Sequence, residues 1–172
     1  MSKLKTASRC LLLALVLGSG AIARAEGQGI GEATLNGGFA RGIGPDAQPS
    51  SVFLGGSFAL VRGWFSLGPE VQYAQGGGRT LIEWGGVSRF RLSGGRVRPF
   101  LVAGLGSYNW KRTSFVTASV LGASFGAGVV LGDPRRHIAL QGEMRFHDNL
   151  QNIGTPGSLQ LFSVSVGARF QW

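Results

Sequence analysis

Residues 137–147, HIALQGEMRFH, carry four side chains that could do chemistry. A carboxylate, Glu143, stands two positions before a guanidinium, Arg145, and imidazoles stand at both ends, His137 and His147. Such groups can transfer protons, ligate metal ions or pair as ions. The alternate positions are Ile138, Leu140, Gly142, Met144 and Phe146. Because successive side chains of a strand point to opposite faces, the segment predicts a strand with one apolar face and one charged face.

The two histidines lie at opposite ends of this predicted strand. A strand rises about 3.3 Å per residue, which places His137 and His147 roughly 33 Å apart. They cannot share a metal ion, and no other group of Asp, Glu and His has the spacing of metal ligands. The GGG at residues 76–78 lacks the strand, lysine and helix of a phosphate-binding loop and predicts a hairpin turn. We therefore expect no metal, no other cofactor and no catalytic site.

The elements that must position these side chains are predicted to be strands alone. Alternating runs are separated by clusters of Gly, Pro, Asp, Asn and Ser, and no helical period follows the first 25 residues. Eight strands are predicted, at about 31–41, 51–61, 64–74, 80–92, 97–110, 114–131, 137–147 and 158–172. The inward and outward faces of strand 97–110 stay undecided, because PFLVAGLG is apolar on both.

Three features favour a membrane barrel over a soluble β-sandwich. The predicted strands exceed the ~5–6 residues usual in a sandwich and match the ~9–11 residues that cross a bilayer. Aromatic residues are also predicted at both strand ends, as in the interfacial girdles of outer-membrane barrels, and longer loops are expected at one end than at the other. One girdle would contain Trp64, Phe65, Phe90, Phe100, Phe170 and Trp172, and the other Phe39, Tyr73, Trp84, Tyr108, Trp110, Phe115 and Phe146.

The first 25 residues predict export. Lys3, Lys5 and Arg9 precede a short apolar run, residues 11–17, and residues 23–25 form an A-x-A cleavage site. The apolar run is too short for the ~20 residues that span a bilayer as a helix. The expected organisation is a signal peptide, 1–25, followed by one barrel domain, 26–172.

The net charge of the exported part is lower than that of the whole sequence. Seventeen basic and eight acidic residues give +9; four basic residues fall in the signal peptide, which leaves thirteen and a charge of +5. Twelve of these are arginines scattered along the chain, and together with export this argues against a nucleic-acid-binding protein. The exported part has no cysteine, which excludes disulfides and thiol chemistry.

The C-terminal segment VSVGARFQW resembles the last strand of bacterial outer-membrane barrels. The matching residues are Val164, Val166, Ala168, Phe170 and Trp172, with Trp in place of the more usual terminal Phe. LGPEVQY, RVRPFLVAGLGSY and EMRFHDNLQNIG are similar to segments of the small OmpA/OmpX-type barrel domains. The resemblance implies an all-β, eight-stranded antiparallel transmembrane barrel with up-and-down order, in the outer membrane of a Gram-negative bacterium. It also implies recognition of the last strand by the barrel-assembly machinery, and surroundings of membrane lipid and lipopolysaccharide.

In such a barrel the charged face of each strand points into the lumen, which eight strands leave just wide enough for side chains to fill. Buried charges must pair there, since an unpaired ion costs several kcal/mol. The expected lumenal ion network is Glu70, Glu83, Arg89, Arg91, Glu143, Arg145 and Arg169, with Gln72, Gln141 and His147 beside it. Small residues of strand 114–131 are expected to make room for the arginines: Ala118, Gly122, Ser124, Gly126 and Gly128.

Three functions stay open for such a barrel. It could be a monomeric structural or surface-interaction protein that acts through its outer loops, which is the function we expect. It could be a lipid-modifying enzyme, since lipid A deacylases carry a serine two residues after a histidine on a late strand. Here Asn149 stands two residues after His147, and the sequence singles out no other serine. It could also be a narrow channel.

Overall fold

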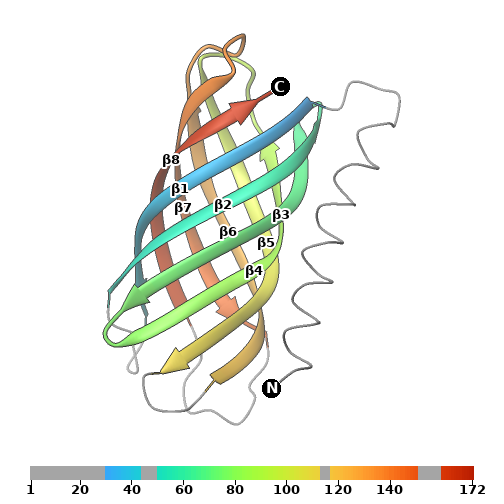
Figure 1. Ribbon diagram of the computed structural model, residues 1–172. Coiled ribbons are helices and arrows are strands. Elements are labelled where there is room, and N and C mark those ends of the chain that lie inside the picture. Colours follow the sequence, from blue (N-terminus) through green and yellow to red (C-terminus); the bar gives the residue numbers. More distant parts are fainter. Residues whose placement is uncertain (1–29, 44–49, 113–116, 151–159) are drawn as a thin grey trace.

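The computed structural model describes residues 30–43, 50–112, 117–150 and 160–172, which form a closed barrel of strands (Figure 1). The strands are β1 (Ile30–Gly42), β2 (Ser51–Arg62), β3 (Phe65–Gly76), β4 (Arg79–Arg91), β5 (Val97–Arg112), β6 (Thr117–Leu131), β7 (Ile138–Asn149) and β8 (Gln160–Gln171). Each pairs antiparallel with the next, and β1 pairs with β8. The eight predicted strands and their up-and-down order are confirmed, with ends that differ by at most three residues.

One part of the sequence prediction falls outside this description. The predicted signal peptide, residues 1–25, is not among the described residues. No helix in the described ranges has the length and apolarity that crossing a membrane requires.

The strands are staggered around the barrel. A path along paired residues runs from Ile30 on β1 through Val61, Ser66, Arg89, Val102, Gly126, Arg145 and Ser163 to Ala40, again on β1. The path returns ten residues further along β1, so the strands must tilt against the barrel axis, as Figure 1 shows. Arg89 and Arg145 lie on this path, three strands apart, and both contact Glu70 and Glu143 in the lumen.

The two faces of the wall differ as the alternation predicts. On β7 and β8 the apolar set points outward, and the exposed fractions of Leu140, Met144, Val164 and Val166 are 47–65%. The intervening polar side chains point inward with exposed fractions of at most 6%: Gln141, Glu143, Arg145, His147, Ser163, Ser165 and Arg169. Water is a poor solvent for so continuous an apolar exterior, whereas hydrocarbon chains suit it.

The inward and outward faces of β5, which the sequence left undecided, are clear in the structure. They also correct the predicted aromatic girdles. Phe100 and Tyr108 point into the lumen with exposed fractions of 1%, so neither belongs to an interfacial girdle. Phe100 packs with Val87, Val102, Val130 and Ala139, and Tyr108 with Phe53, Ala74, Leu81, Val120 and Leu161. The side chains of Trp110 and Phe115 lie outside the described set. The lumen therefore holds two apolar clusters as well as charges.

Two glycines of β6, Gly122 and Gly128, make room for these rings. A Cβ added to Gly122 would lie 2.5 Å from Cε2 of Tyr108, and one added to Gly128 would overlap the ring of Phe100. A Cβ at Gly126 would collide with the backbone of β7 at Met144. At Gly122 and Gly128 the expectation that small residues make room for guanidinium groups is wrong, because aromatic rings of the neighbouring strand β5 occupy that space. The side chain of Ala118 lies outside the described set.

The barrel has two different ends. At the terminus end, where β1 begins and β8 ends, the connections are residues 63–64, 92–96 and 132–137. At the loop end they are residues 43–50, 77–78, 113–116 and 150–159. The expected longer loops thus apply to two of these four. Gly77 and Gly78 have φ angles of 57° and 71°, as a two-residue type I′ hairpin turn requires.

Candidate functional site

A four-residue ion cluster fills the middle of the lumen. Arg145 on β7 donates from Nη1 and Nη2 to Oε1 and Oε2 of Glu70 on β3, at 2.5 and 2.8 Å, and from Nε to Glu143. Arg89 on β4 donates to Oε2 of Glu70 at 3.3 Å and to Oε2 of Glu143 at 3.5 Å. Two positive and two negative side chains balance, and none exceeds 6% exposure.

Neutral groups complete the hydrogen bonding of this central cluster. Gln72 Nε2 donates to Glu70 at 2.9 Å, and Gln141 Nε2 donates to Glu143 at 3.1 Å. Arg89 Nη1 donates to the hydroxyl of Ser57 at 3.2 Å. Buried ions are tolerated when their remaining hydrogen-bonding capacity is met in this way. The cluster is built from β2, β3, β4 and β7, so it ties together opposite sides of the wall.

A second cluster lies toward the terminus end and centres on Glu32 of β1. Arg91 Nη2 donates to Glu32 Oε2 at 2.8 Å, and Arg169 Nη2 donates to the same oxygen. Ser66 Oγ donates to Oε1 at 3.2 Å. One carboxylate thus serves two guanidinium groups, which leaves this cluster with a charge of +1. Glu32 was not predicted from the sequence.

A third cluster lies toward the loop end around His147. Its Nε2 is 3.0 Å from the hydroxyl of Ser163, while Nδ1 is 3.4 Å from Oε2 of Glu83 and 3.1 Å from the hydroxyl of Tyr108. All four side chains come from different strands and are at most 8% exposed. Glu83 forms no ion pair with an arginine among the described residues, so it stands apart from the network expected for it.

The order Ser163–His147–Glu83 is that of a nucleophile, a general base and an orienting acid. Nε2 of His147 can accept from Ser163, while Nδ1 hydrogen-bonds with the Tyr108 hydroxyl and lies within ion-pair distance of Glu83. The adjoining cavity measures about 20 Å³, which holds about one water molecule. Phe53, Leu81 and Leu161 pack beside it. The cluster therefore has the groups of a hydrolase but lacks space for an acyl chain.

The seven residues expected in a lumenal network all come from inward positions. Six have exposed fractions of 8% or less, and the side chain of Arg91 is 18% exposed near the terminus end. They fall into three clusters instead of one. Of the expected assembly signal on β8, Val164 and Val166 face outward, and Ala168 and Phe170 are partly covered.

Solved structures share this architecture. Neisserial surface protein A, NspA, superposes with a TM-score of 0.72 at 12% identity over 84% of this chain and 100% of its own. The chain has the fold of a small outer-membrane β-barrel. The N-terminal barrel domain of Pseudomonas aeruginosa OprF has the same barrel (TM-score 0.62, 17% identity, 86% of this chain and 100% of that one). The outer-membrane enzyme PagL has it too (TM-score 0.55, 15% identity, 81% of this chain and 98% of that one).

At 12–17% identity, the likeness to these small outer-membrane barrels shows the fold alone. No family model matches the sequence, and no curated protein matches it.

Proposed function

We propose that this chain is an integral protein of a bacterial outer membrane, with a lumen closed by paired charges, and that it acts as a structural or surface-interaction protein through its loops. The observation that carries the proposal is the inverted wall. Large apolar side chains such as Leu105, Phe125 and Val166 are 61–65% exposed outside, while Arg89, Arg145 and Arg169 are 1–2% exposed inside. A closed sheet also leaves no free edge, which suits a monomer that satisfies its backbone within lipid.

The loop end offers one platform for a surface partner. The two longest connections, residues 43–50 and 150–159, join β1 to β2 and β7 to β8. Because β8 pairs with β1, these connections leave the barrel from adjacent strands, and Ile43 N donates to Gln160 O at 2.9 Å between them. In outer-membrane barrels the longer loops face the outside and the termini face the periplasm.

The orientation and the folding of the barrel can be tested together. The exported part has no cysteine, so a single Thr155→Cys variant reports on the loop end and an Arg135→Cys variant on the terminus end. We expect a membrane-impermeant maleimide to label Thr155→Cys in intact cells and to label Arg135→Cys only after lysis. Both variants should run as heat-modifiable bands in the outer-membrane fraction. Labelling of Arg135→Cys alone in intact cells, or a protein found outside that fraction, would contradict the proposal.

A lipid-ester hydrolase is a second candidate, favoured by one observation, the contact between Ser163 Oγ and Nε2 of His147 at 3.0 Å. Hydrolysis of phospholipid and lipopolysaccharide esters by the purified, folded protein tests this. Ser163→Ala removes the nucleophile, and Ser165→Ala is the matched control, since both serines are 5% exposed and point inward on β8. A hydrolytic rate that Ser163→Ala abolishes and Ser165→Ala keeps would establish the enzyme. The packed lumen leads us to expect no such rate.

A further inference from the structure

The terminus end of the barrel opens into a basic hollow. Its volume is about 480 Å³, and its lining includes Arg91, Arg98, Arg135, Arg136 and His137. Among the described residues that line it, none has an acidic side chain. Four guanidinium groups around one concave surface are the donors that phosphate oxygens need.

Two of these arginines have nitrogen atoms without a partner. Arg98 is 5% exposed, and its Nη1 donates to the carbonyl oxygens of Gly95 and Gly132 at 3.4 and 3.3 Å. Its Nη2, like Nε of Arg91, has no hydrogen-bond acceptor among the described residues. A buried guanidinium with an unused donor costs free energy unless an acceptor meets it.

The charges at this end do not balance. Glu32 pairs with both Arg91 and Arg169, which leaves +1, and buried Arg98 raises the excess to +2. Asp133 stands nearby in the β6–β7 turn, where its Oδ1 accepts from the backbone N of Arg135 at 2.9 Å. By contrast, the central cluster of Glu70, Arg89, Glu143 and Arg145 is neutral. The excess positive charge of these buried clusters therefore lies at the terminus end, beside the basic hollow.

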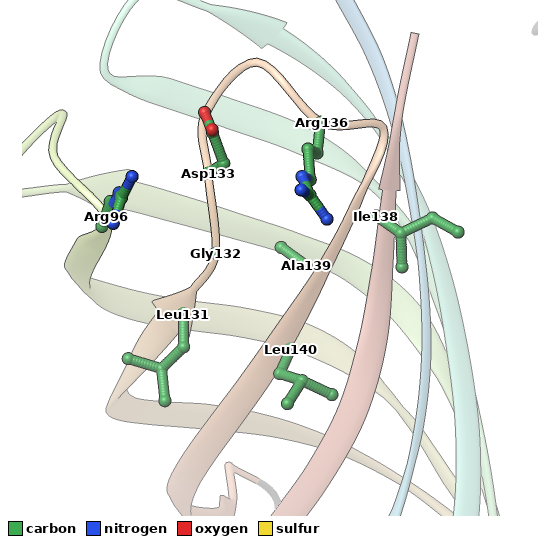
Figure 2. A pocket seen from close by; sticks show the side chains of 8 residues that line it. All are labelled: Arg96, Leu131, Gly132, Asp133, Arg136, Ile138, Ala139 and Leu140. Atoms are coloured by element: carbon green, nitrogen blue, oxygen red, sulfur yellow. The ribbon is translucent and has the colours of Figure 1, made fainter.

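A second hollow adjoins the first and connects it to the outer wall. Figure 2 shows this hollow at the β6–β7 turn, with Arg136 extending from the turn and Arg96 on the neighbouring turn. Arg136 lines both hollows. The lining of the second hollow contains one acidic residue, Asp133, and two arginines. Its apolar part includes Leu131, Ile138 and Leu140, whose exposed fractions are 46%, 59% and 61%. A molecule with an anionic head and apolar chains fits both surfaces at once.

We propose that the terminus end binds an anionic phospholipid, with its phosphate among Arg91, Arg98 and Arg136. The acyl chains lie along Leu131, Ile138 and Leu140. This inference rests on the proposed membrane location, which places the terminus end at the periplasmic leaflet. The phosphate offsets the excess positive charge of Arg98 and of the Glu32 cluster, and the arginines that line the hollow supply its donors. Zwitterionic lipids carry the same phosphate but bring their own cation, so they bind less tightly.

Tryptophan fluorescence gives a direct test, because Trp64 and Trp172 line the basic hollow and are 55% and 58% exposed. The folded barrel is placed in phosphatidylcholine vesicles that contain increasing brominated phosphatidylglycerol, or brominated phosphatidylcholine for comparison. We expect phosphatidylglycerol to quench preferentially. The variants Arg98→Gln and Arg136→Gln should each weaken that preference about tenfold, the loss expected for one charge-assisted contact. Arg62→Gln is the matched control, since Arg62 is exposed at the same end but does not line the hollow.

Each outcome decides the matter. Equal quenching by both lipids, or an Arg62→Gln effect as large as that of Arg136→Gln, would overturn the site while leaving the folded membrane barrel intact. If millimolar glycerol phosphate or inorganic phosphate abolishes the quenching by brominated phosphatidylglycerol, the site binds soluble phosphate. That result would overturn the proposal of a lipid ligand. A chain that shows no heat-modifiable band in vesicles would overturn the proposed function itself. Because Arg136 is exposed, Arg136→Gln keeps the test valid even where Arg98→Gln prevents folding.

Discussion

Arg145 on β7 donates hydrogen bonds from both terminal nitrogen atoms to Glu70 on β3, at 2.5 and 2.8 Å, across the lumen. The two strands lie four positions apart around an eight-stranded wall, so this contact joins opposite sides of the barrel. Arg89 and Glu143 complete the cluster from β4 and β7. A plug of this kind is made by side chains of the wall itself.

Removal of one partner of that contact should be far more harmful than removal of both. We expect Arg145→Met to lower the free energy of unfolding by about 3–5 kcal/mol, because Glu70 and Glu143 then lose a shared cation. The double variant Glu70→Gln/Arg145→Met should lose less than the sum of the single losses, since it leaves Arg89 and Glu143 as a balanced pair. Urea unfolding in vesicles measures the two single variants, Arg145→Met and Glu70→Gln, and the double variant. Additive losses would show that the two side chains act independently.

The outer face should respond to depth in the bilayer. Val166 lies near the middle of β8 and is 65% exposed, whereas Ile138 begins β7 at the terminus end and is 59% exposed. We expect Val166→Arg to cost about 2–4 kcal/mol of stability and Ile138→Arg about 0–1 kcal/mol. The same unfolding assay compares them. Similar values at the two positions would mean that the hydrocarbon layer does not surround the barrel at this level.

Gly128 should be intolerant of even a methyl group. An added Cβ would overlap the ring of Phe100, which is 1% exposed, so Gly128→Ala should destabilise by about 1–3 kcal/mol as other overpacked sites do. The control is Gly86→Ala on β4, where an added Cβ meets nothing within 4 Å. That substitution should be neutral or slightly stabilising. If Gly128→Ala leaves the stability unchanged, the ring of Phe100 does not lie against Gly128.

Glu32 should be more critical than its modest surroundings suggest. It is 1% exposed and is the carboxylate that holds Arg91 and Arg169. We expect Glu32→Gln to cost about 3–5 kcal/mol, because it leaves the buried Arg169 and the partly buried Arg91 without their counter-charge. Asp133→Asn is the comparison, since Asp133 lies in a turn, and it should cost less than about 1 kcal/mol. Equal effects would remove Glu32 from the network.

The strands and their faces could be predicted because period-two alternation is a local signal. Residues 137–147 alternate without interruption, and the structure places Glu143 and Arg145 inside and Leu140 and Met144 outside. The same signal was available for Glu32: with Thr34 and Asn36 it alternates against Ala33 and Leu35. This alternation is a weak signal, because it covers only five residues and Gly37 and Gly38 follow it.

Other features depend on register and could not be predicted. β5 is apolar on both faces, so only its pairing with β6, which sets Gly128 against Phe100, shows which face is inside. The approach of Ser163 to His147 likewise follows from the β7–β8 register, in which Ser163 pairs with Arg145 and Leu161 with His147. A single strand sequence carries no information on such diagonal contacts between strands.

Conductance in planar bilayers tests the closed lumen most directly. The central cluster of Glu70, Arg89, Glu143 and Arg145 spans the interior, and apolar clusters around Phe100 and Tyr108 fill the levels beside it. Purified protein, shown by its heat-modifiable band to be folded, should give no stable single-channel steps. Stable steps of uniform size from the folded, unmodified protein would contradict the plugged barrel and show that the lumen is a pore.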